Sequence, residues 1–133
     1  MLGDRIREIE GKITGVRVIE GQPPRVEVTY QGGGTILGKP CTEMGTYTSS
    51  LQPDGNQYGE GQGVVMTKDG ANLSWHGNGR GKSTGKGMGA SWRATIYYTT
   101  TSPKYSRLNG SPTVVEWEVD PDGNCSGAVW EWK

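Results

Sequence analysis

The sequence predicts an all-β fold, an antiparallel β-barrel of eight or nine strands, on three observations. Glycine supplies 23 of the 133 residues and stands beside five Trp and six Tyr, a mixture typical of strands that bend and bulge. Asp-Gly turn signals at 69–70 and 122–123 separate runs of strand-forming residues. No segment has a long helical pattern. Long strands joined by tight turns favour a closed barrel, which removes the edges of the sheet, over the alternative of a β-sandwich.

Strand patterns recur along the whole chain. Residues 25–30 alternate polar and apolar side chains, as expected of a strand with one buried face. Turn-forming Pro, Gly, Asp and Asn residues stand between this strand and the others. Residues 4–10 carry Ile6 and Ile9 at helical spacing, and this short segment fits either a frayed strand or a single helical turn. Further strands are expected at residues 12–19, 41–51, 58–67, 71–82, 90–101, 113–119 and 126–132.

Length and composition limit the classes of protein. One domain covering residues 1–133 is expected, because a domain usually has about 100–200 residues. The 14 basic and 14 acidic side chains balance, which argues against nucleic acid as a partner, since such binding needs basic groups that neutralise phosphates. No apolar run is long enough for a membrane span, and no apolar leader follows Met1. We therefore expect a cytoplasmic protein with Cys41 and Cys125 as reduced thiols.

Turn lengths predict which side chains face the barrel interior. A two-residue loop at 69–70 pairs Val64 with Trp75, and Met66 with Leu73, on the inner face. Glycines of the partner strand lie opposite the rest of this face, where they either leave a groove or let barrel strands curl. The other side chains on this face of the earlier strand are Tyr58, Glu60 and Gln62.

The final hairpin follows the same rule. A four-residue loop at 120–123 places Trp117 and Trp130 on the inner face and turns Glu131 outward with the other glutamates. Alternation along the preceding long strand turns Trp92 inward. The interior is therefore expected to be large and aromatic. In an eight-stranded barrel such an interior is either just filled by its own side chains or holds one small molecule.

An aromatic interior suits an apolar or amphipathic ligand, lipid-like or phenol-like, and a void of roughly several hundred cubic ångströms is then expected. Glu60 is in addition the candidate catalytic residue. A carboxylate that loses its hydration favours its neutral form and becomes able to exchange a proton near neutral pH. The alternative is a solvated Glu60 at the barrel mouth, or one paired with Arg93 or Arg107. The expected ligand-binding residues are Tyr58, Gln62, Val64, Met66, Trp75, Trp92, Ile96, Trp117 and Trp130.

No metal site and no cofactor are expected. One His and two distant Cys lack the spacing of zinc ligands, and aspartates in turns commonly bond their own backbone. Residues 79–83 resemble a phosphate-binding loop only superficially, since the glycines are one residue too close together and no helix follows.

Glycine and turn residues have a distinctive spacing in the later part of the chain. They occur as GEGQG at 59–63, TKDG at 67–70, WHGNGRG at 75–81, LNG at 108–110 and GAVWEW at 127–132. Over residues 40–133 this pattern resembles a bacterial and archaeal family of small barrels related to allene oxide cyclase, in a superfamily that also includes dirigent-type proteins. The resemblance implies a calycin-like, eight-stranded barrel that binds hydrophobic molecules and assembles as a homodimer or homotrimer.

The sequence thus leaves three functions open. The first is a barrel that binds a small apolar or amphipathic molecule without chemistry. The second, implied by the resemblance, is a cofactor-independent isomerase or cyclase of the allene oxide cyclase type, with Glu60 as acid or base. The third is a structural barrel that forms homo-oligomers through polar rows on its outer face and holds no ligand.

Overall fold

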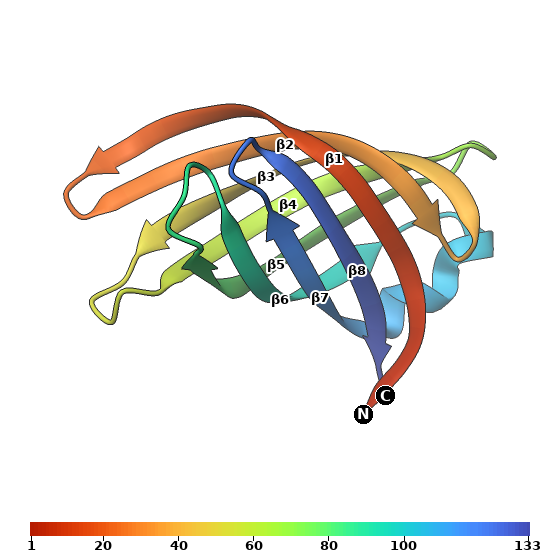
Figure 1. Ribbon diagram of the computed structural model, residues 1–133. Helices are drawn as coiled ribbons and strands as arrows, with labels where there is room; N and C mark the ends of the chain where they lie inside the picture. The colour runs from red at the N-terminus through yellow and green to blue at the C-terminus, as the bar shows by residue number, and fades with distance from the viewer.

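Eight antiparallel strands close into a barrel in the computed structural model, which describes all residues from Met1 to Lys133 (Figure 1). Each strand pairs with its neighbours in the sequence, and the last pairs with the first, which confirms the predicted fold class with eight strands. No helix in the structure has the length and apolar character that crossing a membrane requires. The strands are β1 (Leu2–Gly21), β2 (Pro24–Ile36), β3 (Lys39–Leu51), β4 (Gln57–Thr67), β5 (Asn72–Ser83), β6 (Ala90–Thr99), β7 (Pro112–Val119) and β8 (Asn124–Trp132).

The first strand is longer than the sequence pattern indicated. β1 runs continuously through the segment 4–10 that fitted either a strand or a helical turn. Its pairing with β8 shifts register between Arg5 and Arg7, and a bulge of this kind resets the alternation of side chains. Ile6 and Ile9 are therefore both buried although they stand three positions apart, which explains why their spacing imitated a helix. The β1–β2 hairpin extends well beyond the body of the barrel (Figure 1).

A short 3-10 helix, η1 (Pro103–Gly110), lies between β6 and β7 and packs against one end of the barrel (Figure 1). Its Tyr105 and Leu108 are buried. Asp69, in the β4–β5 turn, accepts hydrogen bonds from the Tyr105 hydroxyl at 3.0 Å and the Lys104 ammonium at 2.5 Å. These donors, Lys104 first, hold the pKa of Asp69 well below its usual value. The helix thus covers the end of the barrel at which β6 ends and β7 begins.

The β4–β5 hairpin corrects the predicted orientation of β4. Its loop has three residues, 68–70, with Gly70 at φ +93°, closed by a bond from the Thr67 amide to the Ala71 carbonyl at 2.9 Å. Trp75 consequently pairs with Gly63 instead of Val64. Because side chains alternate with a period of two, this single residue exchanges the two faces of β4. The side chains that this change places on the outer face are Tyr58, Glu60, Gln62, Val64 and Met66.

The β7–β8 hairpin departs from its prediction in the same way. The Asp120 amide bonds the Asn124 carbonyl at 2.8 Å around a three-residue loop, so Trp117 pairs with Gly127. Trp117 stays inside, as predicted, but Trp130 turns outward. Glu131, expected in water, is only 4% exposed and forms an ion pair with Arg107 of η1.

Large rings and glycines are paired across the barrel interior. A side-chain carbon added to any of five inward glycines would lie less than 3 Å from an aromatic ring on another strand. Glycine therefore leaves the space in which each ring lies against the sheet, and this explains the glycines at these five positions. The pairs are Trp75 on Gly63, Trp92 on Gly59 and Gly81, Trp117 on Gly127, and Tyr30 on Gly45.

Candidate functional site

A cavity of about 80 Å³ lies among the buried aromatic side chains inside the barrel. Aromatic and aliphatic residues form most of its wall, and glycines of β4 and β5 together with Glu43, Glu60 and Asn78 form the rest. It is smaller than the void expected from the sequence, because Tyr30, Tyr47, Trp92 and Trp117 fill much of the interior. The rings pack closely, with centroids 4.8 Å apart for Tyr30 and Trp117 and 5.7 Å apart for Tyr47 and Trp92.

The structure divides the residues expected at the site into two groups. Trp75, Trp92, Ile96 and Trp117 line the cavity. The other residues expected at the site point outward and do not reach the cavity, because the lengths of the two hairpin loops place their side chains on the outer face of the barrel. They are Tyr58, Gln62, Val64, Met66 and Trp130. Three of these side chains, Gln62, Val64 and Met66, are exposed on β4, whereas Tyr58 and Trp130 are half-buried on the outer surface and lie under Arg80 and Arg5 respectively.

Glu60 does not point into the barrel. It belongs to the stretch of β4 that walls the cavity, but its side chain is exposed on the outer face and accepts a hydrogen bond from the Tyr58 hydroxyl at 2.9 Å. It forms no ion pair with Arg93 or Arg107, which pair with Glu118 and Glu131 instead. The expected inward orientation of Glu60 is therefore wrong, and the solvated alternative describes its position.

A different carboxylate borders the cavity. Glu43 of β3 lines it and forms an ion pair with Arg7 of β1, and their side chains are 1% and 0% exposed. Arg7 Nη2 donates to Glu43 Oε1 at 2.5 Å, and Nη1 donates to the Tyr98 hydroxyl at 3.1 Å. Glu43 Oε2 accepts hydrogen bonds from the Tyr30 hydroxyl at 2.5 Å and from Trp75 Nε1 at 3.0 Å. Both oxygens are thus engaged inside the protein.

The surroundings of this ion pair keep its hydroxyl partners protonated. Burial, together with the negative charge of Glu43, raises the pKa of Tyr30 well above its usual value. Burial also raises the pKa of Tyr98, against the opposing effect of Arg7. Buried charges are stable only when they are paired and hydrogen-bonded, and this network meets that condition. At the cavity this network is therefore neutral overall, and its hydrogen-bonding groups already have partners inside the protein.

One polar group of the cavity wall has no partner. Trp117 is 8% exposed, and its indole Nε1 is buried without a hydrogen bond. Burial raises the pKa of Tyr47 to about 12, and the nearby N–H group of Trp117 partly opposes this rise. The N–H group and the Tyr47 hydroxyl do not, however, have the geometry of a hydrogen bond. A buried donor without an acceptor is rare in folded proteins.

Cys41 and Cys125 are free thiols, and both are buried. Burial raises the pKa of Cys41 and raises that of Cys125 to about 11, from an ordinary value of 9.0. Only the thiolate reacts, so at pH 8 we expect Cys125 to react with a disulfide reagent at least about 100-fold more slowly in the folded protein than in urea. A rapid reaction of both thiols of the folded protein with the reagent in a stopped-flow assay would contradict this. No cluster of three or more metal-ligating side chains occurs.

Comparison with known proteins adds information on the fold. No family model and no curated protein sequence matches the chain. A protein of unknown function from Clostridium acetobutylicum has a TM-score of 0.84 at 15% identity over 98% of both chains. A β-barrel-like protein from Acinetobacter baumannii gives 0.79 at 16% identity, over 99% of this chain and 96% of its own. An enzyme from Penicillium herquei gives 0.60 at 16% identity over 97% of both chains.

None of these three neighbours is named as a member of an allene oxide cyclase or dirigent family. At such low identity a similar structure shows the fold alone. The architecture is nevertheless shared along almost the entire length of each chain. The protein is therefore a closed, eight-stranded β-barrel with a buried aromatic cluster, built like small bacterial barrels of unknown function.

Proposed function

We propose that the protein binds a small, neutral, mainly apolar molecule inside the barrel. The observation that carries this proposal is the cavity of about 80 Å³ with its aromatic and aliphatic wall. Apolar cavities in proteins stay dry and take up apolar molecules, as a cavity of about 150 Å³ takes up benzene. The smaller space here suits a compact ring or the end of a longer molecule.

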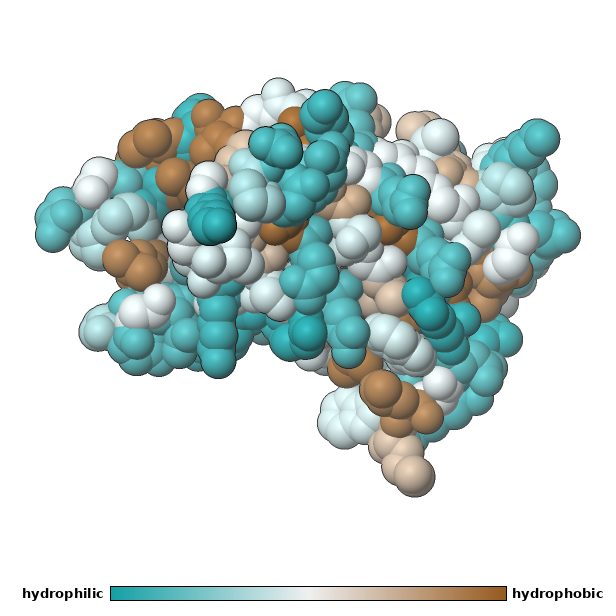
Figure 2. Space-filling model, in the orientation of Figure 1, coloured by the Kyte–Doolittle hydropathy of each residue, from teal (hydrophilic) through white to brown (hydrophobic).

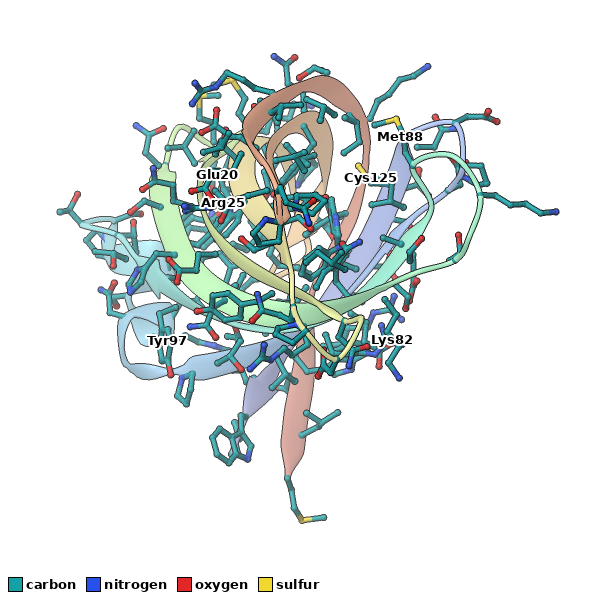
Figure 3. The ribbon with its side chains drawn as sticks, turned by 90° about the vertical axis from the view of Figure 1, so that its left-hand side faces the viewer. Glu20, Arg25, Lys82, Met88, Tyr97 and Cys125 are labelled. Atoms are coloured by element: carbon teal, nitrogen blue, oxygen red, sulfur yellow. The ribbon has the colours of Figure 1, made fainter.

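Apolar surface beyond the cavity supports an amphipathic or lipid-like ligand. The register pairs Val16 with Val28, and Val18 with Val26, on the face of the β1–β2 hairpin that continues the interior. Val16 and Val18 are 50% and 69% exposed. Figure 2 shows apolar side chains gathered over this projecting hairpin, and Figure 3 views the barrel from this side. An alkyl chain that leaves the barrel here would meet apolar side chains instead of water alone.

Binding is better supported than catalysis of the allene oxide cyclase type. A cyclase or isomerase needs an acid or base that reaches the substrate. Glu60 lies on the outer face, and Glu43, which does border the cavity, has its oxygens occupied by Arg7, Tyr30 and Trp75. No carboxylate is therefore free to exchange a proton with a molecule in the cavity.

The test is titration with neutral ring compounds: cyclopentanone, methylenecyclopentane and, as a larger molecule, benzene. We expect at least one to bind saturably and to raise the Tm, because a ligand that binds only the folded state stabilises it. Ala94→Leu should weaken binding at least about tenfold, since Ala94 lines the cavity and the larger side chain would fill it. Calorimetry and ligand-observed NMR measure both effects.

The matched control is Thr99→Leu, which adds a similar side chain to the exposed outer face of the same strand. It should leave the affinity unchanged. Val115→Ile is a gentler cavity-filling variant in case Ala94→Leu unfolds the barrel, and Val115 also lines the cavity. Failure of every compound to bind the wild-type protein would reject the proposal, and so would equal affinities for the cavity variants and the control.

A further inference from the structure

The projecting part of the β1–β2 hairpin has one unpaired edge. β1 pairs with β8 only as far as Lys12, and the Ile13 amide then donates to the Gly123 carbonyl at 2.8 Å. Residues 14–21 of β1 pair with β2 alone, whereas β2 is paired with β3 on its other side. Figure 1 shows this stretch of β1 reaching past the β7–β8 turn. Its outward N–H and C=O groups have no partner in the chain, and such an edge is a ready template for another strand.

The same stretch carries apolar side chains that the chain leaves uncovered. Val16 and Val18 are 50% and 69% exposed, on the face of the hairpin that continues the barrel interior. Natural proteins commonly protect a free edge with charged side chains. Here the one charged side chain between the valines is Arg17, and it already pairs with Glu27 of β2 at 3.3 Å. The edge therefore offers both free backbone groups and apolar surface to a partner.

This segment is complementary to a second copy of itself. Register shifts on either side leave residues 15–18 as the regular part of the edge. Antiparallel pairing about a two-fold axis at Val16 sets Val16 opposite its own equivalent, and Arg17 opposite Gly15 of the other copy. A carbon added at Gly15 meets nothing within 4 Å, so the space beside this residue is open to the guanidinium. An axis at Arg17 would instead place two like charges directly opposite each other, which is destabilising.

We propose that two copies of the chain pair through the free edges of β1, antiparallel, with the two Val16 residues opposite each other at a two-fold axis. The pairing joins both hairpins into one continuous ribbon and gives the free backbone groups their partners. On its inner face, Val28 and Val16 of one copy lie in a row with the same two residues of the other, which removes apolar surface from water. A two-fold contact closes on itself, so association stops at the dimer. The dimer goes beyond the proposed function and requires no ligand in the barrel.

Sedimentation velocity of the whole protein measures this association, at concentrations up to about 1 mM because a single pair of strands forms a small interface. We expect the wild type to dimerise. Val16→Lys and Val16→Glu should each raise the dissociation constant at least about tenfold, since like charges then lie where two valines met. An equimolar mixture of the two variants should recover the dimer, because the lysine of one copy then lies opposite the glutamate of the other.

The matched control is Val64→Lys. Val64 is 43% exposed on β4, both of whose edges are already paired, so this variant should associate as the wild type does. Equal weakening by Val16→Lys and Val64→Lys would overturn the inference, and so would a wild type that stays monomeric at about 1 mM. A mixture of the two Val16 variants that stays monomeric would reject the axis at Val16.

Hydrogen exchange of the wild type tests the same pairing without any substitution, in case the charged variants do not fold. The amides of residues 14–20 that face the other copy should exchange at least about threefold more slowly at about 1 mM than at about 10 µM. Amides of β4 should exchange at the same rate at both concentrations, because their partners lie within one chain. Exchange of residues 14–20 that does not depend on concentration would contradict the dimer.

Discussion

Replacing Glu43 by Gln is expected to lower the free energy of unfolding by about 3–5 kcal/mol, the usual cost of breaking a buried ion pair. Glu43 and Arg7 are almost fully buried, so the change leaves the guanidinium charge in the interior without its counter-charge. The amide also offers one oxygen instead of two. Tyr30 and Trp75, which both donate to Glu43 Oε2, would then compete with Arg7 for a single acceptor.

Urea denaturation followed by tryptophan fluorescence measures this loss. Glu118→Gln is the matched control, because Glu118 pairs with Arg93 at 3.0 Å on the surface, where the two side chains are 50% and 58% exposed. An exposed pair contributes at most about 1 kcal/mol, so this variant should be nearly as stable as the wild type. Equal midpoints for the two variants would show that Arg7 does not depend on Glu43.

The double variant Arg7→Met, Glu43→Gln separates the charge from the hydrogen bonds. Removing the cation as well should recover a large part of the lost stability, because no uncompensated charge remains and Met fills a similar apolar space. A double variant less stable than Glu43→Gln alone would mean that Arg7 stabilises the barrel through other contacts. The Tyr98 hydroxyl, the Thr35 carbonyl and the Cys41 sulfur, which all accept from Arg7, are the ones available.

The sequence predicted the barrel and the inward face of β6 correctly because both depend on features internal to a strand. Trp92 and Ile96 alternate within β6 and both line the cavity. The face of β4 depended instead on the length of a turn. The Asp69-Gly70 pair predicts a two-residue loop, whereas Lys68 belongs to the loop as well, and one residue is enough to exchange the inner and outer faces of a strand.

The buried ion pair of Arg7 and Glu43 could not be predicted from sequence patterns, for another reason. Arg7 and Glu43 are 36 positions apart, and charged side chains are rarely buried unless they are paired. Arg7 turns inward only because β1 bulges beside it, and a bulge leaves no clear mark on the sequence. Glu43 did give a weak signal, since it shares one face of its strand with buried Cys41 and Gly45.

Gly63→Ala is expected to cost about 2–4 kcal/mol, although it adds a single methyl group. The added carbon would lie 2.3 Å from Trp75 Nε1, so the indole must move. That movement combines overpacking, which costs about 1–3 kcal/mol, with loss of the hydrogen bond to Glu43. A role for this glycine in curling the strand would predict a smaller effect, because alanine adopts ordinary strand conformations and Gly63 has no positive φ.

Gly15→Ala is the matched control, since Gly15 also lies in a strand and a carbon added there meets nothing within 4 Å. It should leave the stability unchanged or raise it by up to about 1 kcal/mol, because alanine restricts the unfolded chain. Chemical denaturation of both variants gives the comparison, and near-ultraviolet circular dichroism reports whether the Trp75 ring has moved. Two equal free energies of unfolding would mean that the ring yields without cost, and the interior glycines would then be needed for the bending of strands and not for the rings that lie on them.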